Sequence, residues 1–253
     1  MDEFLAPWKR KREVLGAVVA GSRVVGTHTP NSDIDIHIVL SDRVSWRERG
    51  NRRVAGFLIE YFANPLRQLT AYRENDRKRF VRSEARMFSQ GELWFDKTGA
   101  VARLQRIGRS EMTRPFRRLT AVEIELAKYA LWDELDNLVD LARAESPLHG
   151  HAYHHLLDSV LDAYRRLLGC EVSHLSKLWR FFCEPEFRRR QAYPEFPDQA
   201  FARLFLACVR TMRQSAIERL VEHVHERMGG FHVDGWKLRT PAIPKVARRG
   251  KVH

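Results

Sequence analysis

The sequence predicts an α+β protein, in which strands and helices share the first 112 residues and helices alone follow. Short runs rich in Val and Ile occur before residue 65 and end at turn residues, which is typical of buried strands. Beyond Thr113 the apolar residues recur at helical spacing instead. The composition, 44% apolar and 30% charged, is that of globular proteins and excludes disordered, collagen-like and membrane chains.

The first part of the chain contains the predicted strands. Residues 2–13 carry spaced apolar side chains among charges, which predicts a short amphipathic helix. The valine-rich run 14–20 stops at Gly21-Ser22 and is predicted to be a buried strand that enters a tight turn. Further strands are expected at 34–40, 54–62 and 93–95, and helices at 66–90 and 101–107.

The second part is predicted to be purely helical. Thr120 with Glu123 forms a capping-box pattern, which marks the start of a long helix. We expect three regions: a domain of mixed structure at 1–112, a helical domain at 113–240 and a basic flexible tail at 241–253. Later helices are expected at 147–169, 173–182, 185–190 and 197–228.

The formal net charge of +12 is unevenly distributed. Residues 1–118 carry 24 Lys and Arg against 14 Asp and Glu, whereas residues 119–238 carry 15 against 18. A basic first part suits an anionic ligand such as a nucleotide or RNA, and the slightly acidic second part could accept a neutral or cationic molecule. Solvated charged surfaces explain the same bias equally well.

Membrane and secreted classes are not expected. No apolar run approaches the roughly 20 residues that cross a bilayer, and the first residues lack the features of a signal peptide. Cys170, Cys183 and Cys208 are widely spaced and form no Cys-x-x-Cys pair, so neither a disulfide framework nor a thiolate zinc site is indicated. We expect a cytoplasmic protein with reduced, mostly buried thiols.

The most informative segment joins Gly21-Ser22 to Asp33-Ile34-Asp35 across ten residues. Alternate strand residues share a face, so the two aspartates point the same way. Neighbouring carboxylates repel unless a cation lies between them, and oxygen ligands favour a hard divalent ion such as Mg2+. Gly21 lets the backbone approach a ligand, and Ser22, at the first turn of an expected helix, offers phosphate its hydroxyl and amide groups. Together these residues predict a site for a metal-bound triphosphate.

The segment VVAGSRVVGTHTPNSDIDIHIVL resembles the nucleotidyltransferase superfamily, which includes DNA polymerase beta, poly(A) polymerases and antibiotic nucleotidyltransferases. The segment GELWFDKTGAVARLQRIGRS and the helical part after it are similar to the small bacterial members of the kanamycin-nucleotidyltransferase kind. The resemblance implies a small mixed β-sheet core flanked by helices, followed by an all-α helical bundle domain. It also implies a third carboxylate on a later strand, and this role is carried over to Glu60, in the strand-like segment FLIEYF.

The resemblance implies transfer of a nucleoside monophosphate, with AMP from ATP expected, to a hydroxyl of a small acceptor. Two Mg2+ ions are expected: one bridging the donor phosphates to Asp33 and Asp35, and one held by this pair and Glu60. The suggested acceptors are antibiotics of the aminoglycoside or lincosamide type. The overall basicity argues against a polycationic aminoglycoside, although the acidic balance of the second part weakens that objection.

Several other residues are weaker candidates. Arg23 and Ser32 could contact phosphate or metal-bound water, and helix capping explains Ser32 equally well. Lys177 and Arg180 could reach the triphosphate from the helical domain, and a solvated lysine is an equal alternative. A histidine-rich stretch, His149 to His155, could form a zinc site, the wall of an acceptor pocket or a polar start to a helix.

Two other functions stay open at the level of sequence. Nucleotidyl transfer to RNA or to a partner protein, as in the toxin-antitoxin nucleotidyltransferases, is favoured by the basic stretch 77–86 and the basic tail. A non-catalytic nucleotide-binding module is the other alternative. The sequence indicates neither a particular acceptor nor an oligomeric state.

Overall fold

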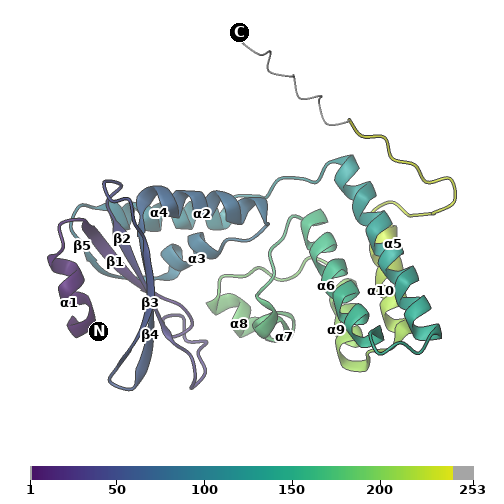
Figure 1. The fold of residues 1–253 in the computed structure, drawn as a ribbon, viewed down its shortest axis with the longest axis horizontal. Helices are drawn as coiled ribbons and strands as arrows, with labels where there is room; N and C mark the ends of the chain where they lie inside the picture. Colours follow the sequence, from purple (N-terminus) through teal and green to yellow (C-terminus); the bar gives the residue numbers. More distant parts are fainter. Residues whose placement is uncertain (1, 242–253) are drawn as a thin grey trace, which may run out of the picture. The chain divides into compact units, whose positions relative to one another are not determined.

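The computed structural model describes residues 2–241 and divides the chain into two compact units (Figure 1). Among these residues, the sheet unit comprises 2–117 together with Leu168–Pro197, and the helical unit comprises Arg118–Leu167 and 198–241. The sequence predicts one continuous helical domain after residue 112, whereas Leu168–Pro197 packs with the sheet. Beyond Pro241, the predicted flexible tail lies outside the described residues.

A five-stranded mixed sheet organises the sheet unit, which confirms the predicted α+β fold class. The strands lie in the order β3-β4-β2-β1-β5. β2 and β4 run parallel, and the other neighbouring strands are antiparallel. The strands are β1 (Val14–Ala20), β2 (Ile34–Leu40), β3 (Glu48–Val54), β4 (Phe57–Pro65) and β5 (Glu92–Asp96).

Different helices cover the two faces of this sheet (Figure 1). On one face, Ile36 of β2 belongs to a buried cluster with Trp8 of α1. On the opposite face, Val39 belongs to a cluster with Leu69 of α2 and Phe88 of α3. Odd-numbered residues of β2 therefore face α2 and α3, because strand side chains alternate. The helices of the sheet unit that precede the helical unit are α1 (Asp2–Arg10), α2 (Leu66–Lys78), α3 (Ser83–Gln90) and α4 (Ala100–Thr113).

Strand β3 is missing from the sequence prediction, which places a single strand at 54–62. Instead, β3 and β4 form a hairpin through Ala55 and Gly56, whose φ angles of 48° and 82° suit a two-residue turn. β3 has the sequence ERGNRRV and lies mostly exposed at the edge of the sheet. It therefore lacks the apolar pattern by which buried strands are recognised.

Two predicted helices are each interrupted by a residue in the left-handed region. Phe80, buried and with a φ of 57°, separates α2 from α3 within the predicted helix 66–90. Met212, with a φ of 48°, separates α9 (Gln199–Thr211) from α10 (Gln214–Arg227) within the predicted helix 197–228. A single left-handed residue reverses the local chain twist, so a right-handed helix cannot continue through it.

The helical unit is built from α5, α6, α9 and α10. The predicted capping box is confirmed, since the Glu123 amide donates to the Thr120 hydroxyl at 3.2 Å and the Thr120 amide donates to the Glu123 carboxylate at 2.8 Å. Among residues 2–241, no helix is both long and apolar enough to span a bilayer. The bounds are α5 (Ala121–Arg143), α6 (His149–Leu167), α9 (Gln199–Thr211) and α10 (Gln214–Arg227).

The segment Leu168–Pro197 adds short helices to the sheet unit: η1 (Leu175–Lys177), α7 (Leu178–Cys183) and α8 (Pro185–Arg190). The three cysteines are free thiols, as predicted. Cys170 and Cys208 are buried, and Cys183 is exposed.

Candidate active site

The three predicted acids lie together on one face of the sheet. Asp35 of β2 pairs with Glu60 of β4 in the parallel register, and Asp33 precedes Asp35 by two residues. Each of the three offers a carboxylate oxygen, and these oxygens all lie within 4.8 Å of one another. The structure thus brings together Asp33, Asp35 and Glu60, which we call the acidic triad.

Burial and mutual repulsion make the triad electrostatically unfavourable without a cation. Burial of its carboxyl group, then the charges of Asp33 and Glu60, raise the pKa of Asp35 to about 6. The positive charge of Lys177 opposes this rise. Arg49 of β3 donates from Nε to Glu60 Oε1 at 3.1 Å and also from Nη2 to the same oxygen. Glu60 Oε2 takes no part in this pairing.

Gly21 directly contacts the triad. It has a φ of 88°, and a Cβ added there would lie 1.9 Å from Asp35 Oδ2, so a side chain would clash with the carboxylate. Ser22 is buried and begins a turn at residues 22–26 rather than the expected helix. The Thr27 amide closes this turn by donating to the Ser22 carbonyl at 2.9 Å. The turn does not continue as a helix, because Gly26 at its end has a φ of 71°, in the left-handed region.

Arg23 and Ser32 brace the loop between the glycine-serine turn and the aspartates. Arg23 Nε donates to the Ser32 carbonyl at 2.8 Å, and its guanidinium lies 5.0 Å from the Phe57 ring centroid. The Ser32 hydroxyl accepts from the Thr29 amide at 2.9 Å and therefore stabilises a turn rather than a helix start.

Lys177 reaches the site from the sheet unit, because Leu168–Pro197 packs against the loop that follows Ser22. Arg180 Nη1 donates to the Thr27 carbonyl at 2.9 Å. Gln191 Nε2 donates to the Thr27 hydroxyl at 2.6 Å. In the structure Arg180 thus binds the loop backbone, whereas Lys177 influences Asp35 through its charge.

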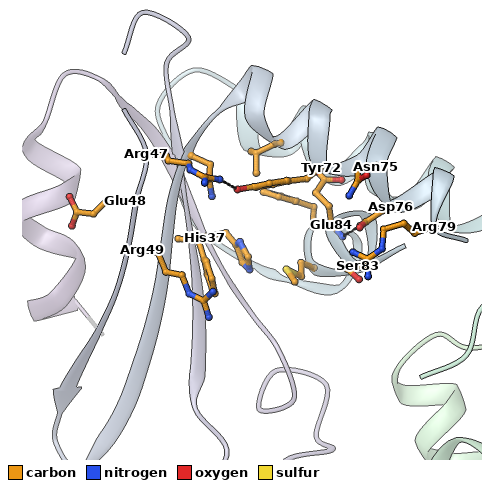
Figure 2. A pocket seen from close by; sticks show the side chains of 15 residues that line it. His37, Arg47, Glu48, Arg49, Tyr72, Asn75, Asp76, Arg79, Ser83 and Glu84 are labelled. Carbon is orange, nitrogen blue, oxygen red and sulfur yellow. Dashed lines mark hydrogen bonds between the residues drawn. The ribbon is translucent and has the colours of Figure 1, made fainter. Parts of the chain in front are cut away.

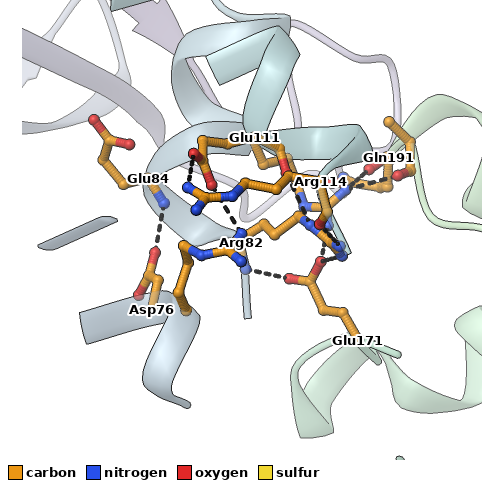
Figure 3. Close-up of polar contacts among 10 residues, drawn as sticks. Asp76, Arg82, Glu84, Glu111, Arg114, Glu171 and Gln191 are labelled. Carbon is orange, nitrogen blue, oxygen red and sulfur yellow. Dashed lines mark hydrogen bonds and ion pairs between the residues drawn. The ribbon is translucent and has the colours of Figure 1, made fainter. Parts of the chain in front are cut away.

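A buried ion network holds this segment in place (Figure 3). Glu171, 3% exposed, pairs with Arg86 Nη2 at 2.5 Å and accepts from the Arg82 amide at 2.9 Å. Arg82 also donates to the carbonyls of Glu111 and Arg114. Glu171 thereby links Leu168–Pro197 to the sheet unit, because its buried carboxylate neutralises the buried Arg86 of α3 and the partly buried Arg82 just before α3.

A cavity of about 710 Å³ lies beside the triad, between the sheet and helices α2 and α3 (Figure 2). His37 is two residues beyond Asp35, and Phe62 is two residues beyond Glu60. The lining comprises His37, Arg47, Glu48, Arg49, Phe62, Asn64, Leu69, Tyr72, Asn75, Asp76, Arg79, Ser83, Glu84, Met87 and Phe88.

Sequence reasoning does not identify Arg49 or this cavity. Arg49 belongs to β3, whose polar sequence gives no strand signal, so nothing places it near Glu60 before the hairpin is known. His37 shares the face of the aspartates by simple alternation, and this is the signal that could have found the cavity. Its ring stacks on Phe62 with centroids 5.2 Å apart, and burial lowers its pKa to about 4.

The histidine-rich stretch at the start of α6 shows no metal site. Within residues 2–241, the acidic triad is the only group of three or more His, Cys, Asp or Glu side chains placed to share an ion. His155 Nε2 lies 3.9 Å from Glu134 Oε1 instead. The structure therefore gives no support to the zinc hypothesis.

Comparison with known proteins supports the sequence resemblance. Residues 1–84 match the family model described as nucleotidyltransferase domain, which confirms the predicted superfamily for this part of the chain. No curated protein sequence matches the chain. Among solved structures, the chain is similar to a nucleotidyltransferase-like protein from Exiguobacterium sibiricum 255-15, with 10% identity and a TM-score of 0.48, covering 90% of this chain and 72% of that one.

Glu171→Ala is expected to destabilise the protein by about 3–5 kcal/mol, because it leaves buried arginine charges without their carboxylate. The measurement is urea unfolding at neutral pH. Glu186→Ala is the control in the same segment, since its partner Arg190 is half exposed and such pairs contribute about 1 kcal/mol or less. Equal losses in the two variants would contradict the role of the buried network.

Asp35→Asn is expected to stabilise the metal-free protein at pH 8. The folded pKa of about 6 lies above the ordinary 3.8, so ionisation of Asp35 opposes folding above pH 6 and ceases to do so below about pH 4. Allowing for its partial exposure, the gain at pH 8 should be about 1–2 kcal/mol.

The gain is measured by urea unfolding in EDTA at pH 8 and again below pH 4, where it should vanish. Asp136→Asn, at an exposed position of α5, controls for a general charge effect. A pH-independent loss of stability in Asp35→Asn would show that ionisation of Asp35 does not oppose folding.

Proposed function

We propose, on the premise that residues 1–84 form a nucleotidyltransferase domain, that the protein transfers a nucleoside monophosphate from a nucleoside triphosphate to an acceptor hydroxyl. The observation that carries this proposal is the convergence of Asp33, Asp35 and Glu60 to within 4.8 Å, next to the glycine-serine turn. A triphosphate needs such a turn for its phosphates and such acids for its counterion.

The triad suits a divalent cation. All three side chains offer oxygen, which Mg2+ prefers, and burial together with the charges of Asp33 and Glu60 raises the pKa of Asp35, which a bound cation would oppose. Asp33 and Asp35 would hold the ion that also binds the donor phosphates, and Glu60 would share in holding a second. Bound there, the metal would neutralise charge on the transferred phosphoryl group and lower the pKa of the attacking hydroxyl.

The chain's own residues have distinct tasks in this proposal. The Gly21-Ser22 turn binds the triphosphate through backbone amides and the Ser22 hydroxyl, and Lys177 adds a positive charge. Arg23 and Ser32 are proposed to shape the loop around these phosphates. Arg49 fixes Glu60 through one carboxylate oxygen, which leaves Oε2 available to the metal or the acceptor proton.

The proposed transfer forms one bond at the α-phosphorus and breaks another. The acceptor oxygen bonds to the α-phosphorus, and the bond from that phosphorus to the oxygen bridging it to the β-phosphorus breaks. Pyrophosphate leaves with the electron pair, and a carboxylate of the triad takes the hydroxyl proton. We propose ATP as the donor and a small hydroxylated molecule as the acceptor.

RNA as the acceptor loses its strongest sequence support in the structure. Three arginines of the basic stretch 77–86 face the protein's own acids, since Arg77 pairs with Glu111 at 3.0 Å, and Arg82 and Arg86 pair with Glu171 at 3.7 and 2.5 Å. Lys78 and Arg79 of the same stretch are exposed. The three paired guanidinium groups, which are half-buried or buried, are already neutralised. A small acceptor is therefore the better supported alternative.

Nucleotide binding is expected to depend on magnesium and on the two aspartates. Mg-ATP at a hundred times its Kd should stabilise the protein by about 2.7 kcal/mol, as measured by thermal unfolding. GTP, CTP and UTP, each with and without Mg2+, test the choice of base. Asp33→Ala and Asp35→Ala should lose the magnesium-dependent part, whereas stabilisation that ignores both metal and mutation would favour a non-catalytic binding module.

Glu60→Gln is expected to lower turnover by about two orders of magnitude or more while nearly preserving Mg-ATP binding, since it removes a metal ligand or proton acceptor. Pyrophosphate release across a set of hydroxylated acceptors and RNAs measures this. Glu92→Gln, at an exposed acid of β5, is the matched control. Unchanged turnover in Glu60→Gln would remove Glu60 from the site.

A further inference from the structure

The cavity adjoins the acidic triad along strands β2 and β4. Along β2 and β4, His37 and Phe62 each follow a triad residue by one two-residue step, which spans about 7 Å. Arg49 joins the two regions, because it pairs with Glu60 while its guanidinium lies 4.9 Å from the Phe62 ring centroid. A molecule in the cavity would therefore lie within reach of the reacting phosphate.

His37 gives the floor of the cavity an unused polar group. Its side chain is 7% exposed, and its Nε2 is buried without a hydrogen-bond partner. Such a group costs free energy unless a ligand satisfies it. The rings of Phe62, Tyr72 and Phe88 also line the cavity, which suits a cyclic ligand. A volume of about 710 Å³ is that of a small-molecule site.

The acids that line the cavity are occupied by the protein itself. Asp76 accepts from the Glu84 amide at 2.8 Å, and the Glu84 carboxylate pairs with Arg73 at 3.1 Å. Glu48 accepts from the Tyr61 hydroxyl at 2.6 Å and lies apart from the other labelled side chains (Figure 2). Glu84 and Asp76 thus have positive charges of the protein beside them, from Arg73 and Arg79, whereas Glu48 is hydrogen-bonded by a neutral hydroxyl.

The rim of the cavity, by contrast, carries a positive charge from Arg47. Arg47 is exposed and donates to the Tyr72 hydroxyl (Figure 2). In the part of the chain that the structure describes, Arg47 has no carboxylate partner. Four of its five N–H donors remain for a ligand, and guanidinium binds carboxylate and phosphate groups well.

The direction of the reaction indicates which substrate the cavity holds. Ala20 pairs with Asp35, so the glycine-serine turn after Ala20 lies toward the start of β2, and the cavity lies toward its end. The attacking and leaving oxygens of phosphoryl transfer lie roughly in line. If the triphosphate tail lies at the turn, the attacking hydroxyl comes from the side of the cavity.

We propose that this cavity binds the acceptor, and that the acceptor is a small cyclic molecule with a hydroxyl group and a carboxylate or phosphate group. The anionic group pairs with Arg47, the ring lies among the aromatic side chains, and a polar group hydrogen-bonds to His37. This assignment rests on the proposed function, since only a nucleotidyl transfer gives the cavity an acceptor to hold. It also disfavours polycationic acceptors.

The test uses four para-substituted probes that share a hydroxymethylphenyl group: hydroxymethylbenzoate, hydroxymethylphenyl phosphate, benzenedimethanol and hydroxymethylbenzylamine. Their binding to the full chain is measured by calorimetry without nucleotide or metal. The carboxylate or the phosphate probe should bind about tenfold more tightly than the neutral probe, and the amine most weakly. Which of the two anions binds better identifies the anionic group.

Matched variants locate the probes. Arg47→Met, at the position just before β3, should remove the preference for anions and leave the neutral probe unchanged, whereas Arg52→Met, within β3 and facing the opposite side of the sheet, should change nothing. His37→Leu should weaken all the probes, and retained stabilisation by Mg-ATP shows that this variant folds.

Two results would overturn the proposal. One is the absence of a preference for the anionic probes. The other is a loss of ATP affinity in Arg47→Met as large as the loss of affinity for the anionic probes, which would assign the cavity to the nucleotide. Pyrophosphate release with Mg-ATP is scored separately. Its absence despite probe binding would refute the proposed function, and its presence with unaltered probe binding in Arg47→Met would refute only the acceptor assignment.

Discussion

The parallel pairing of β2 with β4 is the constraint on which the rest of the site depends. Its register places Asp35 beside Glu60 and His37 beside Phe62. A slip of one residue would turn Glu60 toward the face covered by α1. The register is held from that opposite face, where β2 and β4 bury apolar side chains such as Ile36 and Ile59 against α1. Core packing on one side thus positions the acids on the other.

The acidic triad is stabilised by side chains from distant parts of the sequence. Arg49 comes from the edge strand β3, and Lys177 comes from the segment after α6. Neither is itself fixed by the Asp-x-Asp motif. The position of β3 at the sheet edge places Arg49, and the buried pair between Glu171 and Arg86 anchors the segment that carries Lys177. Contacts far from the acids therefore influence the charge environment of the triad.

The sequence predicts the parts of the structure whose signal is local. Buried strands such as β1 and β2, the capping box at Thr120 and the shared face of Asp33 and Asp35 follow from patterns within a few residues, whereas Glu60 is implied by the family resemblance. Strand β3 could not be predicted, because its side chains are polar and mostly exposed to water at the sheet edge. Its sequence therefore lacks the apolar pattern that marks a buried strand. The packing of Leu168–Pro197 involves ion pairs across about ninety residues, such as Arg82 with Glu171, which no local pattern contains. The catalytic roles of the acids stay a prediction.

The insertion of Arg118–Leu167 between two portions of the sheet unit has a consequence for the covalent architecture. The polypeptide passes between the units three times, at residues 117–118, 167–168 and 197–198. A contiguous N-terminal fragment would therefore lack the carboxylate that neutralises Arg86. The sheet unit is complete only after the ribosome has synthesised the α5–α6 hairpin, so its final assembly during translation waits for the segment that carries Lys177.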